Sequence, residues 1–250
     1  MNQMPSTKDI KLGENFKGLF VGATGNRKTA SATSFYEAGP IWVADFDGKL
    51  DVCKEIFPQA DIEYDIFTSS NYYKFLGILR EKTDSNKYRT IVVDSYTSFT
   101  QSLILWHMDV KQGGGERKVT KAGVVVPSWD EFSAEAKDTS VLLEIMKGAK
   151  CNFILTAHPI KSSKKDEQGR VIESIATAGQ KGPALVPPMF KEVYFFGLES
   201  SLDASKPPKF IVQTQPTSEC FARTNLGLPA KLELSNDTNL YQLIQKNKKV

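Results

Sequence analysis

The 250-residue sequence has few of the side chains that bind structural metals or form disulfides. Its three cysteines, Cys53, Cys151 and Cys220, are far apart and odd in number, and the two histidines are also widely separated. Neither pattern suits a zinc site or a disulfide framework. We therefore expect reduced, partly buried thiols in a reducing compartment.

Long apolar runs are also missing. No stretch of about eighteen apolar residues appears, so we expect no membrane span. Residues 1–14 are polar, carry mixed charge and lack the apolar centre of a secretory signal, which predicts a cytoplasmic protein. The net charge is only +3, which by itself says little about nucleic acid. With 40% hydrophobic residues, the composition is typical of a soluble globular protein.

Short apolar runs alternate with segments of helical periodicity along the chain. The expected strands cover residues 17–21, 41–44, 90–93, 152–156, 193–196 and 209–214. The expected helices cover residues 29–38, 72–81, 98–108, 129–147 and 240–244. This alternation predicts an α/β fold with a mainly parallel sheet flanked by helices. We divide the chain into an N-terminal extension (residues 1–15), a core (16–235) and a C-terminal helix with a basic tail (236–250).

The most informative segment joins the first expected strand to the first expected helix. It forms a candidate phosphate-binding loop of small and polar residues: Gly22, Ala23, Thr24, Gly25, Asn26, Arg27, Lys28, Thr29 and Ala30. Small residues let backbone N–H groups converge on phosphate oxygens, and the helix N-terminus adds a favourable dipole. Lys28 is expected to bind the β- and γ-phosphates, and the Thr29 hydroxyl to ligate Mg²⁺. We therefore expect ATP and Mg²⁺ as ligands.

This loop departs from the usual pattern at Arg27, where the full motif has glycine. The arginine either points away from the nucleotide or contacts phosphate itself, and it is also compatible with weak hydrolysis. The alternative for the whole segment is a turn that resembles the motif by chance.

Polar side chains follow three of the expected strands. Asp94 is placed to hold the magnesium shell, with Ser95 assisting through water. Asp45 and Asp47 follow the strand expected over residues 41–44. Asp47 is a candidate base or orienter for the attacking water, and a solvated acidic turn is the alternative for this pair. Thr156 and His158 are candidates for sensing the γ-phosphate, and a surface histidine is the alternative. Because ligands collect at the carboxyl ends of parallel strands, these groups are expected to form one site.

Four segments, in this order, resemble the RecA-like ATPases, and especially the compact ones encoded by bacteriophages. They are GATGNRKT (22–29), WVADFDGKLD (42–51), TIVVDS (90–95) and NFILTAHP (152–159). A fifth, ARTNLGLP (222–229), resembles a late segment of the phage members, so the similarity covers residues 16 to about 230. The resemblance implies a RecA-like P-loop core in which Asp47 takes the place of a catalytic glutamate and His158 lies on the sensor strand. Arg27 and Asp47 are departures that concern the rate of hydrolysis more than nucleotide binding.

The resemblance also implies a DNA path lined by two loops. Residues 111–126 and 160–181 occupy comparable places and carry an excess of cations: Lys111, Arg117, Lys118, Lys121, Lys161, Lys164, Lys165, Arg170 and Lys181. Glycine and positive charge suit a phosphate backbone, although neither loop has aromatic residues for stacking, and a pair of solvated surface loops is the alternative. A catalytic cation reaching ATP across a subunit interface is either Lys181 or Arg223.

These expectations describe a phage-type ATPase that acts on single-stranded DNA in recombination or annealing. It is expected to form a homo-oligomeric ring or filament, with a single-strand-binding protein as a possible partner and no membrane contact. Two alternatives use the same core: a helicase-like or packaging motor or loader, and a nucleotide-binding module without turnover.

Overall fold

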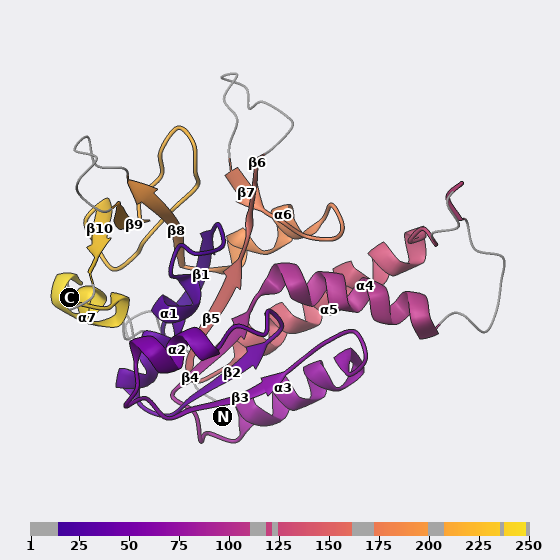
Figure 1. Ribbon diagram of the computed structural model, residues 1–250, viewed down its shortest axis with the longest axis horizontal. Helices are drawn as coiled ribbons and strands as arrows, with labels where there is room; N and C mark the ends of the chain where they lie inside the picture. The colour runs from indigo at the N-terminus through magenta and orange to yellow at the C-terminus, as the bar shows by residue number, and fades with distance from the viewer. Residues whose placement is uncertain are drawn as a thin grey trace, which may run out of the picture.

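The central sheet has eight strands, and its order along the sheet is β10-β9-β8-β1-β5-β4-β2-β3 (Figure 1). The computed structural model describes residues 15–110, 119–121, 125–161, 173–199, 208–235 and 238–248. The strands of this sheet are β1 (Lys17–Gly22), β2 (Ile41–Asp45), β3 (Ile62–Ile66), β4 (Thr90–Asp94), β5 (Asn152–Ala157), β8 (Glu192–Glu199), β9 (Lys209–Gln213) and β10 (Lys231–Leu234). Neighbours from β8 to β3 pair in parallel, whereas β9 and β10 pair antiparallel. A separate antiparallel pair joins β6 (Pro159–Lys161) to β7 (Glu173–Ile175).

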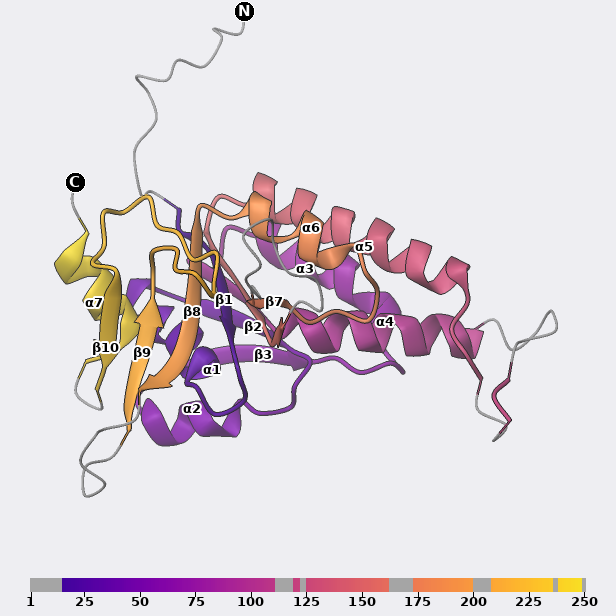
Figure 2. The same ribbon diagram turned by 90° about the horizontal axis from the view of Figure 1, so that it is seen from above.

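Helices cover both faces of this sheet (Figure 2). They are α1 (Lys28–Thr33), α2 (Asp51–Ile56), α3 (Phe75–Asp84), α4 (Tyr96–Val110), α5 (Trp129–Gly148), α6 (Gly182–Leu185) and α7 (Leu240–Asn247). Short 3₁₀ helices occur at η2 (Ser34–Ala38), η3 (Tyr72–Lys74) and η5 (Pro187–Met189). The described helices do not include one that is both long enough and apolar enough to cross a membrane.

Each parallel strand contributes side chains to two hydrophobic cores, because successive residues point to opposite faces. In β1, Leu19 and Val21 pack in the core that contains residues of α3, α4 and α5. Phe20, between them, packs in the core that contains residues of α1, η2 and α7. A strand buried on both faces reads as a continuous apolar run, which explains why the central strands are visible in the sequence.

The predicted fold class is therefore confirmed, with local corrections. The expected helix over residues 29–38 is a short α-helix followed by η2. Strand β3 escaped prediction because, at the edge of the sheet, it alternates apolar and acidic residues and lacks a continuous apolar run. The loop expected over residues 160–181 contains the end of β6 and strand β7 in its described part, and α6 and η5 follow it.

Candidate functional site

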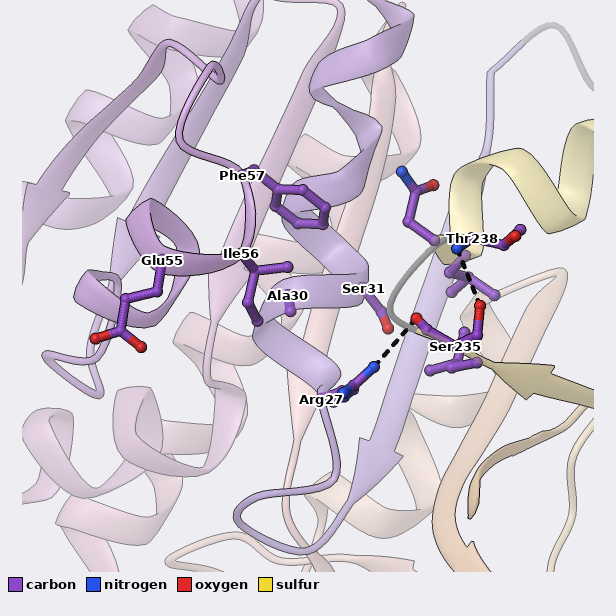
Figure 3. A pocket seen from close by; sticks show the side chains of 11 residues that line it. Arg27, Ala30, Ser31, Glu55, Ile56, Phe57, Ser235 and Thr238 are labelled. Atoms are coloured by element: carbon purple, nitrogen blue, oxygen red, sulfur yellow. Dashed lines mark hydrogen bonds between the residues drawn. The ribbon is translucent and has the colours of Figure 1, made fainter. Parts of the chain in front are cut away.

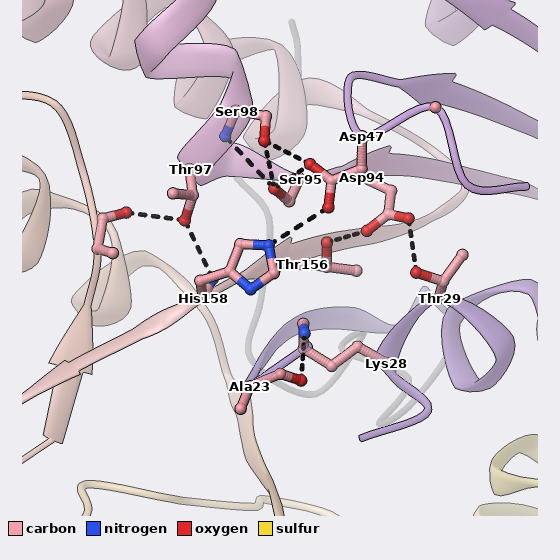
Figure 4. Close-up of polar contacts among 12 residues, drawn as sticks. Ala23, Lys28, Thr29, Asp47, Asp94, Ser95, Thr97, Ser98, Thr156 and His158 are labelled. Carbon is pink, nitrogen blue, oxygen red and sulfur yellow. Dashed lines mark hydrogen bonds and ion pairs between the residues drawn. The ribbon is translucent and has the colours of Figure 1, made fainter. Parts of the chain in front are cut away.

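The sheet register brings the carboxyl ends of three central strands together (Figure 4). In the β2–β4 pair, Asp45 lies directly opposite Asp94. In the β4–β5 pair, Val93 lies opposite Leu155, so Thr156 follows beside Asp94. The loop between β1 and α1 lies at the same edge, because β1 pairs in parallel with β5. Residues far apart in the sequence thus share one edge of the sheet.

The turn after β1 needs glycine at two positions. A Cβ atom on Gly22 would lie 2.7 Å from the Phe196 carbonyl oxygen, so a larger residue there would clash with β8. Gly25 has a φ of +85°, which side chains rarely tolerate. Lys28 is buried, and its ammonium donates to the Ala23 carbonyl oxygen at 3.0 Å. The backbone therefore curls around the ammonium, as a phosphate-binding loop requires.

The Arg27 side chain points away from this loop. Of the two alternatives left open by the sequence, this supports an arginine that does not contact phosphate. Its φ of +62° is in the left-handed region, where the usual motif has glycine. The guanidinium carbon lies 4.1 Å from the centre of the Phe210 ring, and Nη1 donates to the Ser235 carbonyl oxygen at 3.2 Å. Figure 3 shows the side chain directed toward Ser235. The loop thus keeps the shape of a phosphate-binding loop, and Arg27 connects it to the C-terminal strands.

A cavity of about 300 Å³ lies beside α1, next to the loop. Its wall includes Ala30, Ile56, Phe57 and Leu240, with Arg27 at one side (Figure 3). The rest of its wall is mainly polar, and a cleft of this size beside a phosphate loop has room for a planar aromatic ring.

Two oxygen ligands suited to a hard cation meet beside the loop. The Thr29 hydroxyl donates to Asp94 Oδ2 at 2.7 Å, and the Thr156 hydroxyl donates to Asp94 Oδ1. Burial raises the pKa of Asp94, while these two hydrogen bonds favour its ionised form. Carboxylate and hydroxyl oxygens are the ligands that Mg²⁺ prefers, so the residues present fit this ion.

A second carboxylate, Asp47, is held from several sides. Its Oδ1 accepts hydrogen bonds from Ser95 Oγ, at 2.9 Å, and from Ser98 Oγ. Its Oδ2 lies 3.3 Å from His158 Nε2. Burial acts to raise the pKa of Asp47, but the hydrogen bonds from His158, Ser98 and Ser95 outweigh it and lower the pKa to about 2. Asp47 is therefore ionised near neutral pH, and its orientation is well defined.

Asp45 has a different task from Asp47. Its Oδ1 accepts hydrogen bonds from the backbone N–H groups of Asp47, at 3.0 Å, and Gly48, at 2.7 Å. Burial raises the pKa of this carboxyl. Asp45 thus shapes the turn that presents Asp47 to the site, so the acidic pair is more than a solvated turn.

Two threonine hydroxyls of α4 form hydrogen bonds with backbone groups of the segment after β5. The Thr97 hydroxyl accepts from the His158 N–H at 3.0 Å and donates to the Ala176 carbonyl oxygen at 2.9 Å. One turn later, the Thr100 hydroxyl accepts from the Ala178 N–H at 3.1 Å. The start of α4 therefore contacts both the site and the chain that leads to α6.

The two cations considered for an intersubunit role differ in their surroundings. Arg223 Nη2 donates to the carbonyl oxygens of Pro187 and Phe190, so this side chain anchors the chain before β8. Lys181 is exposed at the N-terminus of α6, outside the Asp47 and Asp94 hydrogen bonds. Most of the loop cations, Lys111, Arg117, Lys118, Lys164, Lys165 and Arg170, lie outside the described residues.

Ser98 is the contact to Asp47 that sequence reasoning missed. It lies three residues after Ser95, so at the start of a helix both hydroxyls face the same side. That spacing was a signal for Ser98, but it could not show which carboxylate the two hydroxyls would meet.

Comparison with known proteins identifies the family of this chain. A search of curated proteins found no match. A family model described as an AAA domain matches residues 14–226, which is most of the chain and includes the phosphate loop, Asp47, Asp94 and His158. The chain therefore belongs to the AAA domain family, a family of P-loop nucleotide-binding ATPases.

Proposed function

We propose that the chain binds ATP with Mg²⁺, hydrolyses the γ-phosphate, and uses this cycle to act on single-stranded DNA in recombination or annealing. The proposal of ATP hydrolysis rests on two pairs of interacting side chains that meet at one edge of the sheet. The Thr29–Asp94 pair and the Asp47–His158 pair both lie beside the phosphate loop (Figure 4).

The loop and its surroundings divide the work of binding. Backbone N–H groups of residues 22–29 and the Lys28 ammonium bind the phosphates. The cavity beside Ala30 accepts the base. When bound, Mg²⁺ offsets the phosphate charge, with Thr29 Oγ1 and Asp94 as its protein ligands.

Asp47 orients the attacking water in line with the γ-phosphate. A carboxylate with a pKa of about 2 is a weak proton acceptor at neutral pH, so positioning and electrostatics contribute most. His158, which lies between Asp47 and the loop in Figure 4, is placed to detect the γ-phosphate. Ser95 and Ser98 hold Asp47 in place.

Coupling to DNA runs through the contacts of α4. Because Thr97 and Thr100 contact both His158 and residues 176–178, a change at the γ-phosphate reaches the cationic segment that ends at Lys181. The exposed cations Lys121, Lys161 and Lys181 support binding to a phosphate backbone. ATP lies between subunits of a ring or filament, and Lys181 reaches it from the neighbour. Both residues are exposed, but the Arg223 guanidinium already donates to two carbonyl oxygens, which favours Lys181 for this role.

The test is ATP turnover with and without single-stranded DNA, for the natural chain, Lys28→Ala and Asp47→Asn. We expect DNA-stimulated turnover in the natural chain, loss of nucleotide affinity in Lys28→Ala, and nucleotide binding without turnover in Asp47→Asn. Turnover that DNA does not change refutes the DNA part and leaves the ATPase part. Nucleotide binding without turnover in the natural chain refutes hydrolysis and favours a non-catalytic module.

Two further measurements address the assembly and the type of motor. Gel filtration with ATP reports the oligomeric state, and a persistent monomer refutes a shared nucleotide. A strand-displacement assay separates annealing from a helicase-like motor, because displacement of a paired strand is not expected from an annealing protein.

A further inference from the structure

A second, larger cavity lies at the opposite edge of the sheet from the phosphate loop. Its volume is about 680 Å³. Lys17, Asn152 and Glu192, which line it, are the first residues of β1, β5 and β8. Since the phosphate loop follows the last residue of β1, the whole length of this strand separates the cavity from the nucleotide site, roughly 20 Å for a strand of this size. This cavity, called the basal groove below, takes no part in the proposed hydrolysis.

The charged residues that line the basal groove are almost all positive. The cations are Lys17, Arg89, Lys147, Lys191 and Lys248, and the single acid among the lining residues is Glu192. Lys17 donates to the carbonyl oxygens of Ala149, at 2.8 Å, and Cys151, at 3.0 Å, and Lys147 forms an exposed pair with Glu144. Lys191 and Lys248 are exposed at the rim. The groove therefore favours an anionic ligand.

Glu192 does little to oppose this charge. Its Oε2 accepts from Tyr194 Oη, at 2.7 Å, and from Thr224 Oγ1, at 2.6 Å, and its Oε1 accepts from the Asn225 N–H at 2.9 Å. Burial raises the pKa of this carboxyl. Its hydrogen-bonding capacity is used inside the protein, so it is not a ligand for a cation from outside.

Apolar side chains form the floor between these cations. Met189, Leu226 and Tyr241 line the groove and are half-buried, so part of each side chain stays accessible. The aromatic rings of the floor pack against one another: Phe35 lies 4.8 Å from Phe16 and 5.1 Å from Tyr241, measured between ring centres. The floor thus suits apolar side chains of a ligand better than stacked nucleobases, which need free ring faces.

We propose that the basal groove binds an acidic peptide segment that carries bulky apolar side chains. The carboxylates contact Arg89, Lys191 and Lys248 at the rim, and the apolar side chains cover Met189 and Leu226. Charge complementarity at the rim and burial of apolar area at the floor are the usual division of labour in a peptide-binding site. The partner is a protein segment of this chemistry.

The test measures fluorescence polarisation of a short labelled peptide, a run of aspartates followed by leucine and phenylalanine, without nucleotide. We expect saturable binding to the natural chain that weakens as salt rises. The double variant Lys191→Glu/Lys248→Glu should weaken binding at least about tenfold, since it reverses two rim charges. Met189→Gln, a change at a half-buried position, should weaken it about threefold by removing apolar contact. The matched control Lys54→Glu/Lys137→Glu reverses two exposed lysines outside the groove and should bind the peptide unchanged.

Several outcomes overturn the proposal. They are the absence of saturable binding, equal affinity of the groove and control variants, and binding that does not depend on the leucine and phenylalanine. A labelled oligothymidine serves as the competing ligand. If the groove variant loses oligothymidine affinity but keeps the peptide, the groove is a nucleic-acid site and the peptide proposal is wrong. Because ATP is absent, these results are independent of whether the chain hydrolyses it.

Discussion

A single carboxylate, Asp47, receives contacts from three side chains on two parts of the chain. Ser95 directly precedes α4, Ser98 lies in its first turn, and His158 follows β5. Hydrogen bonds to an ionised group are among the stronger ones in proteins, so removing one partner should have a measurable effect.

We expect Ser98→Ala to lower kcat by about tenfold while the KM for ATP stays nearly constant, because the variant loosens Asp47 without touching the phosphate loop. The natural pKa of about 2 should rise, since the lost hydrogen bond stabilised the ionised form. The acid limb of the kcat–pH profile should then move to higher pH. Ser102→Ala, one turn further along α4, is the matched control. A change confined to KM would contradict a positioning role.

Arg27 combines an unfavourable backbone with favourable side-chain contacts. Its left-handed φ of +62° costs a residue with a side chain roughly 1–2 kcal/mol. The contacts with Phe210 and Ser235 offset a similar amount, taking about 0.5–1 kcal/mol for the ring contact.

Two substitutions at this position separate those effects. Arg27→Ala loses the contacts and keeps the strained backbone, whereas Arg27→Gly loses the contacts and relieves the strain. We expect Arg27→Ala to be the less stable variant by about 1 kcal/mol in urea unfolding. Equal stability of the two variants would show that position 27 is unstrained.

The C-terminal helix α7 packs into one of the two hydrophobic cores of the sheet. Leu240 and Ile244 of α7 are buried in the same core as Phe35, and the Tyr241 N–H donates to Ser34 Oγ at 3.2 Å. Asn239 caps the helix and its side chain accepts from the Gln242 N–H. In the sequence analysis we divided the chain between residues 235 and 236. The described helix nevertheless packs directly against the sheet.

Removing the buried side chain of α7 should consequently destabilise the whole core. We expect Ile244→Ala to lower the free energy of unfolding by about 3 kcal/mol, the usual cost of deleting a buried isoleucine side chain. Gln245→Ala, at the exposed neighbour, should be close to neutral. A separate early transition for α7, with the main midpoint unchanged, would show that the helix is only loosely attached.

Nucleotide binding should be visible in the stability of the entire molecule. A ligand at about one hundred times its Kd adds about 2.7 kcal/mol to the free energy of unfolding. For a chain of this size that corresponds to a rise of about 5–10 °C in Tm. We expect this rise with Mg²⁺ and a non-hydrolysable ATP analogue, and a smaller one after chelation of Mg²⁺. Lys28→Ala should show almost none, and a normal rise in that variant would place the nucleotide elsewhere.

Two cavities with different chemistry lie at opposite edges of the same sheet. The nucleotide edge has the carboxylates of Asp45, Asp47 and Asp94 and a lysine in the phosphate loop, whereas the basal groove combines cations with an apolar floor. β1 and β8 run between the two edges, and both are buried along most of their length. Helix α7 lines both cavities, through Leu240 at the nucleotide edge and through Tyr241, Ile244 and Gln245 at the basal groove.

Local sequence was sufficient for the central strands and for the strand–loop–helix arrangement around residues 22–29. Each depends on neighbours in the chain: a buried parallel strand needs a continuous apolar run, and a phosphate loop needs small residues between a strand and a helix. Edge strand β3 could not be read in this way, because its side chains are only partly buried.

Contacts between distant segments decided the remaining features. The direction of Arg27 depends on Phe210 and Ser235, and Ser98 reaches Asp47 across a gap of about fifty residues of sequence. The basal groove collects its cations from the ends of several strands and helices. Such positions are set by how the sheet twists and how the helices pack on it, and neither periodicity nor motif spacing encodes which distant side chains then become neighbours.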